Sequence, residues 1–547
     1  MEYGINNSLR NQNFKLSLWL VLICIVAALP GFFTASISIN TFDEPYQIMN
    51  AYDFHNAVYS PLSGILGHWV GSIFGWEYLV FRRLLIVLLV VSIYISSQYA
   101  LVNCSNKKLI LIFAGFCTFF ATVFKSDMNI YGWDHWSAVA VVINMVLLLS
   151  ILKQWSLNKI IWLGFVSGIC VLLRLPNIAI VFFSVILLWL IGYKRLGGVR
   201  LALDLCVYCI AAVATCILIL WISYGSIGNY LVTFNDNPVG AHSLGRILKP
   251  LSLSFLSILR FTAIMLLGYW VIWFACNRCK RLWVKVLLIS LMTICYFLLV
   301  MPLRRPVLGN IVETPISYAM SGLLLLFVRG CRNKQKREIL YALTILLIGS
   351  VIIAGSNWGA YKFLAWPSIP LIVMAVASKW SKSITWYSIS VGIAMFAYSF
   401  YGCFRPTFDD GQYNKLTYRL NEGVFKGMYT NPKRGAEMDE VLKTVKPYQV
   451  AGYEIIPIRL QNEYLWEYMF MWRNGYQRHQ FDNWDAYNDP AYVAWVVDMM
   501  GREDGKRKLL MYIIDEKNPS NLMFEALSNN FIKVGSGSRF LLFVKEK

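Results

Sequence analysis

Long apolar runs separated by short polar connections occupy the chain from residue 15 to about residue 402. An apolar run of about 20 residues with few charges is long enough to cross the hydrocarbon of a bilayer as a helix. The pattern therefore predicts a polytopic α-helical membrane protein with about thirteen transmembrane helices. The predicted spans are 15–36, 84–102, 109–124, 138–152, 160–173, 178–193, 201–224, 252–276, 284–302, 316–328, 339–355, 365–378 and 385–402.

The pattern changes after residue 402, where short apolar strands alternate with helical stretches. "YQVAGYEIIPI" and "KLLMYIID" are typical of strands, and "NEYLWEYMFMWRNGY" and "NLMFEALSNN" are typical of helices. The final stretch, "NFIKVGSGSRFLLFVKE", predicts a hairpin around its Gly and Ser residues. We therefore expect a membrane domain over residues 1–402 and a soluble α/β domain over residues 403–547.

Composition agrees with this division, since 57% of the residues are hydrophobic and only 15% are charged. The net charge of +20 would suggest nucleic acid in a soluble protein. Here, however, the Lys and Arg residues collect in alternate connections, and positively charged loops stay in the cytoplasm. The N-terminus is thus expected inside, with the first long loop and residues 403–547 outside. These connections contain Lys107/Lys108, Lys153/Lys159, Lys194/Arg195/Arg200, Arg278/Lys280/Arg281/Lys285, Arg329/Arg332/Lys334/Lys336/Arg337 and Lys379/Lys382.

The twelve cysteines point to no particular chemistry. Most lie inside apolar runs, where a thiol behaves as a small hydrophobic group. Cys276 and Cys279 form a single CxxC with no second pair and no nearby histidine, which argues against a zinc site.

Acidic residues and histidines gather in the connections predicted to lie outside. The first loop contains Asp43, Glu44, Asp53 and His55, and the second, "KSDMNIYGWDHWS", contains the other cluster. Loops outside the membrane are generally polar, and this alone accounts for most of these residues when each is taken singly. They explain the pair in "FDEP" less well, because a carboxylate so close to the hydrocarbon is costly unless it is solvated or paired. The second cluster consists of Asp127, Asp134 and His135.

The first outer loop, about residues 35–83, has helical patterns of its own. "DEPYQIMNAYDFHNAV" favours a short helix with Pro45 in its first turn. "SPLSGILGHWVGSIFGWEYLV" contains apolar and aromatic residues without Lys or Arg, which indicates an amphipathic helix at the membrane interface. A plain connector is the alternative interpretation.

These features together resemble the GT-C class of membrane glycosyltransferases. "TFDEPYQ" is similar to the acidic motif of protein O-mannosyltransferases and related enzymes that use polyprenyl-phosphate sugars, a superfamily that includes aminoarabinose transferases. "VFRRLL" resembles the arginine motif that follows this loop, and "GWDHW" resembles the second acidic motif. "LLRLPN" and "AGSNWGAYKFLAWPSIPL" resemble stretches of bacterial members. The resemblance covers most of the membrane part and none of residues 403–547.

The resemblance implies transfer of a sugar from a polyprenyl-phosphate donor to an acceptor hydroxyl at the outer membrane face. The expected setting is the bacterial cytoplasmic (inner) membrane, and the expected partners are membrane lipids, the lipid-linked donor and a glycan, lipid or protein acceptor, without nucleic acid. One base and no enzyme nucleophile would imply inversion at the anomeric carbon. A carboxylate at the membrane surface suits the base, because partial desolvation raises its pKa toward the working pH.

The resemblance carries the base onto Asp43, with Glu44 as its positioning partner and Asp134 as the second catalytic candidate. The donor phosphate requires cations on the outer side, for which we select Arg83, Arg174, Arg260 and Lys362. Arg260 differs from the others because it lies well inside an apolar run, where a charge is functional by default. Snorkelling of these side chains to lipid headgroups is the alternative. The remaining candidates for the cavity are Asp127, His135, His55, Arg304 and Arg305.

No cofactor is expected. The acidic residues could form an oxygen-ligand site, but no spacing requires one, so we expect no metal. Two alternative functions remain at this stage. A transporter or flippase of lipid-linked glycans would explain the many helices, although it predicts internal repeats that the sequence does not show. An O-antigen ligase-like enzyme usually depends on a large late outer loop, whereas the large loop here is the first.

Overall fold

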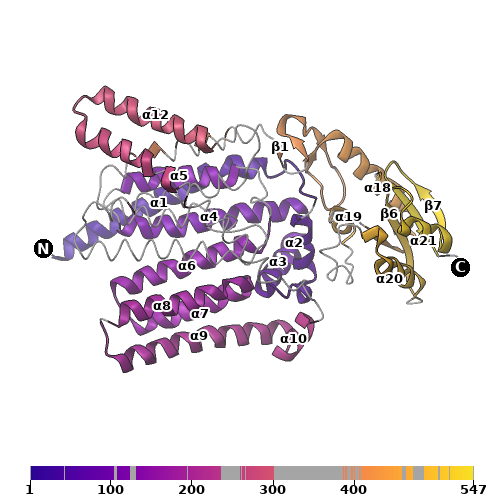
Figure 1. The fold of residues 1–547 in the computed structure, drawn as a ribbon, viewed down its shortest axis with the longest axis horizontal. Helices are drawn as coiled ribbons and strands as arrows, with labels where there is room; N and C mark the ends of the chain where they lie inside the picture. Colours follow the sequence, from indigo (N-terminus) through magenta and orange to yellow (C-terminus); the bar gives the residue numbers. More distant parts are fainter. Residues whose placement is uncertain are drawn as a thin grey trace.

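The computed structural model consists of a helical bundle and a mixed α/β unit at one end of it (Figure 1). It describes residues 2–41, 43–103, 107–123, 131–193, 195–235, 259, 262–264, 266–300, 324, 386, 389–390, 393, 396–397, 400, 406–407, 410–458, 464–471, 486–502, 505–516 and 518–545. The predicted spans 316–328, 339–355 and 365–378 lie almost wholly outside these residues.

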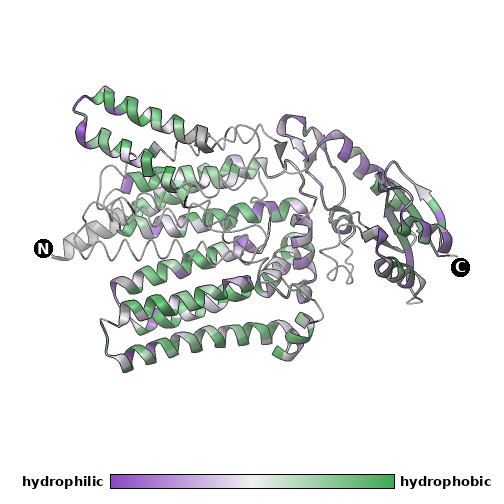
Figure 2. Ribbon diagram, in the orientation of Figure 1, coloured by the Kyte–Doolittle hydropathy of each residue, from purple (hydrophilic) through white to green (hydrophobic). Residues whose placement is uncertain are grey.

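Long helices run side by side through the bundle (Figure 1). Four of those described are long and apolar enough to cross a membrane, namely Phe14–Thr34, Tyr78–Val102, Trp133–Ile151 and Gly198–Tyr224. Figure 2 shows that the bundle is predominantly hydrophobic along its length. The helices are α1 (Glu2–Thr34), α4 (Tyr78–Asn103), α5 (Lys107–Val123), α6 (Trp133–Lys153), α7 (Leu157–Leu173), α8 (Ile178–Gly192), α9 (Gly198–Tyr224) and α12 (Leu282–Val300).

Glycine allows α7 and α9 to approach closely. A Cβ built on Gly164 would lie 2.5 Å from the Tyr208 carbonyl oxygen, and one on Gly168 would lie 2.5 Å from the Ala212 carbonyl oxygen. Spaced four residues apart, the two glycines form the small-residue face that brings membrane helices into contact. The predicted spans over 160–173 and 201–224 thus correspond to one closely packed helix pair.

Short helices cover one end of the bundle, which we call the site end, and the α/β unit lies against it (Figure 1). They are α2 (Asp43–Tyr52), η1 (Phe54–Asn56), α3 (Pro61–Phe74), η2 (Leu175–Asn177) and α10 (Ile227–Asn235). Helix α3 begins with Pro61 in its first turn and exposes Trp69, Ile73 and Phe74, as an interfacial helix would. The connections α4–α5, α6–α7 and α8–α9, which contain the basic residues, lie at the opposite end (Figure 1).

The α/β unit has a four-stranded sheet of order β5-β6-β8-β7, in which β5 and β6 are parallel and the other pairs are antiparallel. The predicted terminal hairpin is the β7–β8 pair. The predicted strand from Tyr448 is shorter than expected, because α18 continues to Val450. The strands are β5 (Tyr453–Ile458), β6 (Arg507–Ile513), β7 (Ile532–Ser536) and β8 (Phe540–Val544), and the helices are α18 (Pro432–Val450), α19 (Leu465–Met469), η6 (Ala486–Asn488), α20 (Pro490–Gly501) and α21 (Leu522–Asn530).

Helices cover both faces of this sheet, because successive side chains of a strand point to opposite faces. On β6, Leu509 and Met511 pack with α18 and α19, whereas Leu510 and Tyr512 pack with α20 and α21. Before the sheet, short elements connect the bundle to α18. They are β1 (Pro406–Thr407), β2 (Gly411–Gln412), η4 (Tyr413–Lys415), β3 (Tyr418–Arg419) and β4 (Tyr429–Thr430).

The core between α18 and the sheet continues into the bundle. The same hydrophobic cluster contains Met438 of α18, Trp466 of α19, Ile48 of α2 and Tyr78 of α4. The α/β unit therefore shares a core with the first outer loop rather than being joined to it only by a linker.

We expect Gly164→Ala to destabilise the protein by about 1–3 kcal/mol, because the added methyl group forces α7 and α9 apart. Thermal unfolding in detergent measures this change. Gly198→Ala is the matched control, since a Cβ there meets nothing within 4 Å. Equal melting temperatures for the two variants would contradict the close packing.

The arrangement also predicts sidedness. In a cysteine-free background, cysteines placed at the exposed positions Glu77 and Asp498 should react with a membrane-impermeant maleimide from the same side of the membrane. A cysteine at exposed Lys280, in the turn before α12, should react only from the other side. Labelling of all three positions from one side would contradict the arrangement.

Candidate active site

The acidic pair of the first outer loop lies where α2 begins. Helix α2 starts at Asp43, and the amide N–H of Glu44 donates to the Asn40 side-chain oxygen at 3.2 Å. Asn40 thereby satisfies one of the amide groups that every helix leaves unpaired in its first turn. The backbone of Asp43 is thus placed, whereas its side chain is outside the described part of the structure.

Glu44 is fully buried, and both of its carboxylate oxygens accept hydrogen bonds. Arg82 Nε lies 2.7 Å from each oxygen, and the Tyr78 hydroxyl donates to Oε2. The backbone N–H of Tyr131, which comes from the second outer loop, donates to Oε1 at 3.0 Å. One carboxylate therefore joins α2, α4 and the segment before α6.

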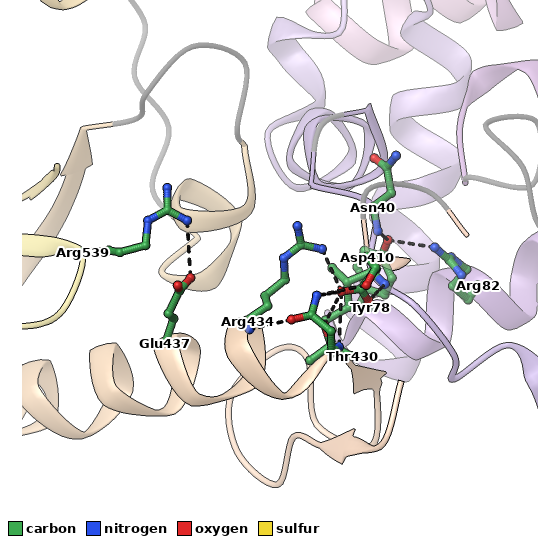
Figure 3. Close-up of polar contacts among 10 residues, drawn as sticks. Asn40, Tyr78, Arg82, Asp410, Thr430, Arg434, Glu437 and Arg539 are labelled. Atoms are coloured by element: carbon green, nitrogen blue, oxygen red, sulfur yellow. Dashed lines mark hydrogen bonds and ion pairs between the residues drawn. The ribbon is translucent and has the colours of Figure 1, made fainter. Parts of the chain in front are cut away.

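Arg82 and Arg83 occupy different environments although they are adjacent. Arg82 is only 1% exposed, and its Nη2 donates to the Tyr78 hydroxyl at 3.0 Å (Figure 3). Arg83 is exposed, with its guanidinium carbon 4.9 Å from the centre of the Phe32 ring. Arg83, one of the four candidates for binding the donor phosphate, therefore takes no part in the ion pair with Glu44.

Sequence reasoning missed the partner of Glu44, although the helical period contained the signal. Tyr78, Arg82, Leu85 and Leu89 recur every three or four residues and are all buried. Arg83 is in register with Val87 and Val91, which are exposed at 50% and 36%. Residues three and four apart share one face of a helix, so the buried stripe includes Arg82 and excludes Arg83.

Tyr131 holds the second outer loop against the first. Its ring centre lies 4.9 Å from that of Phe81, and its hydroxyl accepts from Trp136 Nε1 at 3.1 Å. A Cβ added to Gly67 of α3 would lie 2.6 Å from this hydroxyl, so only glycine leaves room for it. Burial raises the pKa of Tyr131 well above its usual value, and the phenol therefore stays neutral.

The second acidic motif forms an ion pair with the arginine that follows α7. Asp134 lies in the first turn of α6, and its Oδ1 is 3.3 Å from Arg174 Nε. The Asp134 side chain is 20% exposed and that of Arg174 is 5% exposed. Arg174 has extended backbone angles just before Leu175 and Pro176, where α7 ends. Two candidates from separate motifs are thus in contact.

The first outer loop also supports the backbone around Arg174. The Ser63 hydroxyl donates to the Leu173 carbonyl oxygen at 2.8 Å, and the Leu175 N–H donates to the Tyr59 carbonyl oxygen at 3.0 Å.

The two histidine candidates differ in burial. His135 is buried, with only 3% of its surface exposed. His55 is exposed and packs against Phe54 and Tyr224.

Several candidates lie outside the described residues. They are Asp127, Arg260, Arg304, Arg305 and Lys362. Among the residues that are described, no group of three or more His, Cys, Asp or Glu side chains could hold a metal ion.

Two surface cavities lie away from the acidic motifs. One, of about 600 Å³, is lined by residues at the start of β5 and β6, including Gly452 and Arg507. The other, of about 360 Å³, lies between Glu77 and α18. Neither is lined by Glu44 or Asp134, so the candidate site is identified by its polar contacts and not by cavity size.

Breaking the Glu44–Arg82 pair should destabilise the protein strongly. Glu44→Gln leaves the Arg82 charge buried without its counter-ion, which typically costs about 3–5 kcal/mol. Thermal unfolding in detergent would show this as a large fall in melting temperature, with exposed Glu77→Gln as the control. The double variant Glu44→Gln/Arg82→Met should lose less than the sum of the single variants, because the two changes remove the same interaction. Additive losses would contradict the pairing.

Comparisons with family models and with curated protein sequences find no match for this chain. Solved structures, in contrast, include similar folds over nearly the whole chain. The archaeal oligosaccharyltransferase AglB from Archaeoglobus fulgidus, in complex with an inhibitory peptide and a dolichol-phosphate, aligns with a TM-score of 0.50 and 11% identity, covering 98% of this chain and 74% of that one.

Two further structures align with lower scores. An A. fulgidus oligosaccharyltransferase complex with Zn and sulfate has a TM-score of 0.49 and 12% identity, over 97% of this chain and 73% of that one. ArnT from Cupriavidus metallidurans bound to undecaprenyl phosphate has a TM-score of 0.45 and 12% identity, over 96% and 97%. The likeness to AglB spans both the bundle and the α/β unit, and it confirms the GT-C fold that the acidic motifs implied.

Proposed function

We propose that this chain is a membrane glycosyltransferase that moves a sugar from a polyprenyl-phosphate donor to an acceptor hydroxyl. The reaction takes place at the site end of the bundle, which faces the outside of a bacterial cytoplasmic membrane with the N-terminus in the cytoplasm. Residues 1–402 form the catalytic membrane domain, and residues 403–547 form the extracytoplasmic domain. No metal takes part in this proposal.

The contact between the two acidic motifs is the observation that carries the proposal. Glu44, the residue after Asp43, accepts a hydrogen bond from the backbone of Tyr131, which is three residues before Asp134. Asp134 in turn pairs with Arg174 at 3.3 Å. A base and a cation for a leaving phosphate must lie at one site, and these contacts bring candidates for both roles to one end of the bundle.

The fold supports the choice of donor. AglB, whose structure aligns with 98% of this chain, is in complex with a dolichol-phosphate. A polyprenyl phosphate has the same chemistry, which is a long apolar chain that ends in a phosphate. A membrane bundle with cations at its site end suits both parts of such a lipid.

In the proposed reaction Asp43 accepts the proton of the acceptor hydroxyl. The acceptor oxygen then forms a bond to the anomeric carbon, while the bond from that carbon to the phosphate oxygen breaks and the electron pair leaves with the polyprenyl phosphate. Direct displacement inverts the configuration. Arg174, together with Arg83, Arg260 and Lys362, stabilises the charge on the departing phosphate.

Glu44 does not suit the role of base in this scheme. Both of its oxygens already accept hydrogen bonds from Arg82, Tyr78 or Tyr131. Taking a proton would cancel the charge that pairs with buried Arg82. Glu44 therefore acts as a positioning residue that fixes α2, on which Asp43 is the first residue.

The test is Asp43→Asn, which keeps the size of the side chain but removes its capacity to accept a proton. A general base contributes about 10²–10⁴-fold in rate, so we expect a loss of this size in transfer from a panel of polyprenyl-phosphate hexoses and pentoses. Binding of the donor lipid should stay within about twofold. Asp53→Asn, in the same loop, is the matched control and should retain transfer.

Two outcomes would contradict the proposal. Full transfer by Asp43→Asn would remove Asp43 from the role of base. Movement of the intact lipid-linked sugar across a vesicle membrane by the unmodified protein, without any transfer to an acceptor, would favour a flippase instead.

A further inference from the structure

The segment that leads into α2 is held by the α/β unit. Between α1 and α2, the Ser36 carbonyl oxygen accepts from the Tyr429 N–H at 2.7 Å, and the Ser38 N–H donates to the Tyr429 carbonyl oxygen at 2.8 Å. The Thr41 carbonyl oxygen accepts from the Leu465 N–H at 3.1 Å. Residues 36–41, which we call the lead segment, thus depend on residues that are more than 380 positions away in the sequence.

Ser38 lies in the middle of the lead segment and has strained backbone angles. Its φ is +73°, a left-handed conformation that L-residues with a Cβ rarely adopt. Ser38 is also fully buried. A strained conformation of this kind persists only where its surroundings determine it, and such positions are concentrated at functional sites.

Asp410 lies directly against the residue after this strained position. Its Oδ2 accepts from the Ile39 N–H at 2.9 Å, and its side chain is fully buried. Figure 3 shows Asp410 with Thr430 and Arg434. Its Oδ1 accepts from the Thr430 hydroxyl at 2.5 Å, the Asn431 side-chain amide at 2.8 Å and Arg434 Nη1 at 2.9 Å. Asp410 is thereby fixed by the start of α18 and presents its second oxygen to the lead segment.

The next residue of the lead segment completes the connection to the acidic pair. The Asn40 N–H donates to the Tyr78 hydroxyl at 3.0 Å (Figure 3). This hydroxyl also donates to Glu44. The Asn40 side chain in turn accepts from the Glu44 N–H. A displacement of Ile39 would therefore be transmitted to the first turn of α2 through Asn40.

We infer that Asp410 is a positioning residue for the transfer reaction, and that it acts by holding the strained lead segment in the conformation from which α2 and its acidic pair start. This inference rests on the proposed function. It assigns to the α/β unit a part in catalysis, namely the positioning of the acidic pair.

Asp410→Asn tests the inference, because the amide has the shape of the carboxylate but only one acceptor oxygen. Every observed partner of the two Asp410 oxygens is a donor, so the amide nitrogen must face an N–H or O–H group in either orientation. We expect kcat to fall on the order of 10²-fold while KM for the donor changes by about twofold or less. Asp498→Asn, which alters an exposed ion pair on α20, is the matched control and should leave kcat unchanged.

Rescue at Ser38 separates positioning from general stability. Glycine adopts a positive φ without steric cost. Adding Ser38→Gly to the Asp410→Asn variant should therefore raise kcat about tenfold or more above that of Asp410→Asn alone. Ser38→Ala keeps the Cβ and should restore nothing. If the two substitutions had equal effects, or if Asp410→Asn lowered kcat only in proportion to the amount of folded protein, the positioning role would be overturned.

Hydrogen exchange gives a readout that needs no substrate. In the full-length protein in detergent, Asp410→Asn should raise the exchange rate of amides in the peptide that covers residues 36–42 by about tenfold or more, while β6 and β8 remain protected. Unchanged exchange in this peptide would overturn the inference even in an active enzyme. If the unmodified protein transferred no sugar, the proposed function would fail together with the catalytic part of the inference, although exchange would still show whether Asp410 holds the lead segment.

Discussion

The ion pair between Glu44 and Arg82 joins the segments that form the candidate site. Both side chains are at most 1% exposed, so neither charge is stabilised by bulk water and each depends on the other. Because Glu44 also accepts hydrogen bonds from the Tyr78 hydroxyl and from the Tyr131 backbone N–H, it fixes α2 relative to α4 and to the second outer loop. A hydrophobic contact in the same place would tolerate small shifts, whereas a buried carboxylate with these partners accepts only a narrow range of geometries.

A consequence is that the α/β unit and the bundle cannot be separated without disturbing this pair. Tyr78, which donates to Glu44, also accepts from the Asn40 N–H, and the Tyr78 N–H donates to the Val424 carbonyl oxygen at 2.8 Å. The Tyr468 hydroxyl donates to the Trp76 carbonyl oxygen at 2.6 Å, just before α4. The hydrophobic core that contains Ile48, Met438 and Trp466 also contains Tyr78, so these polar contacts lie beside that core. Although hydropathy predicts a division of the chain at about residue 402, the described residues of the α/β unit and the first outer loop share one core and are not independent structures.

The sequence predicted the elements more fully than their contacts. Apolar period and length identified the spans that became α1, α4 to α9 and α12, because each helix satisfies its backbone hydrogen bonds internally and its pattern is local. The position of Asp134 beside Arg174 depends on how α6 packs against α7, which a linear pattern does not contain. The role of Asp410 was even less accessible. It lies in an unremarkable "FDDG" stretch, and its partner Ile39 is 371 positions away. The helical register of Arg82 was readable in principle, since it shares a buried stripe with Leu85 and Leu89.

In the proposed reaction, the two adjacent carboxylates of the first outer loop must meet opposite physical requirements. A positioning carboxylate is most effective when it is buried and both of its oxygens accept hydrogen bonds, as in Glu44, because any movement then breaks several of these bonds. A general base must instead keep a lone pair for the acceptor proton. One residue cannot meet both requirements, but two consecutive residues at the start of a helix can, since the peptide bond between them is rigid and the fixed residue restricts its neighbour. In the proposed reaction Asp43 and Glu44 are therefore not two equivalent acids, because Glu44 fixes the start of α2 whereas Asp43 is the reactive group. The strained lead segment before them holds the same turn of α2 in place.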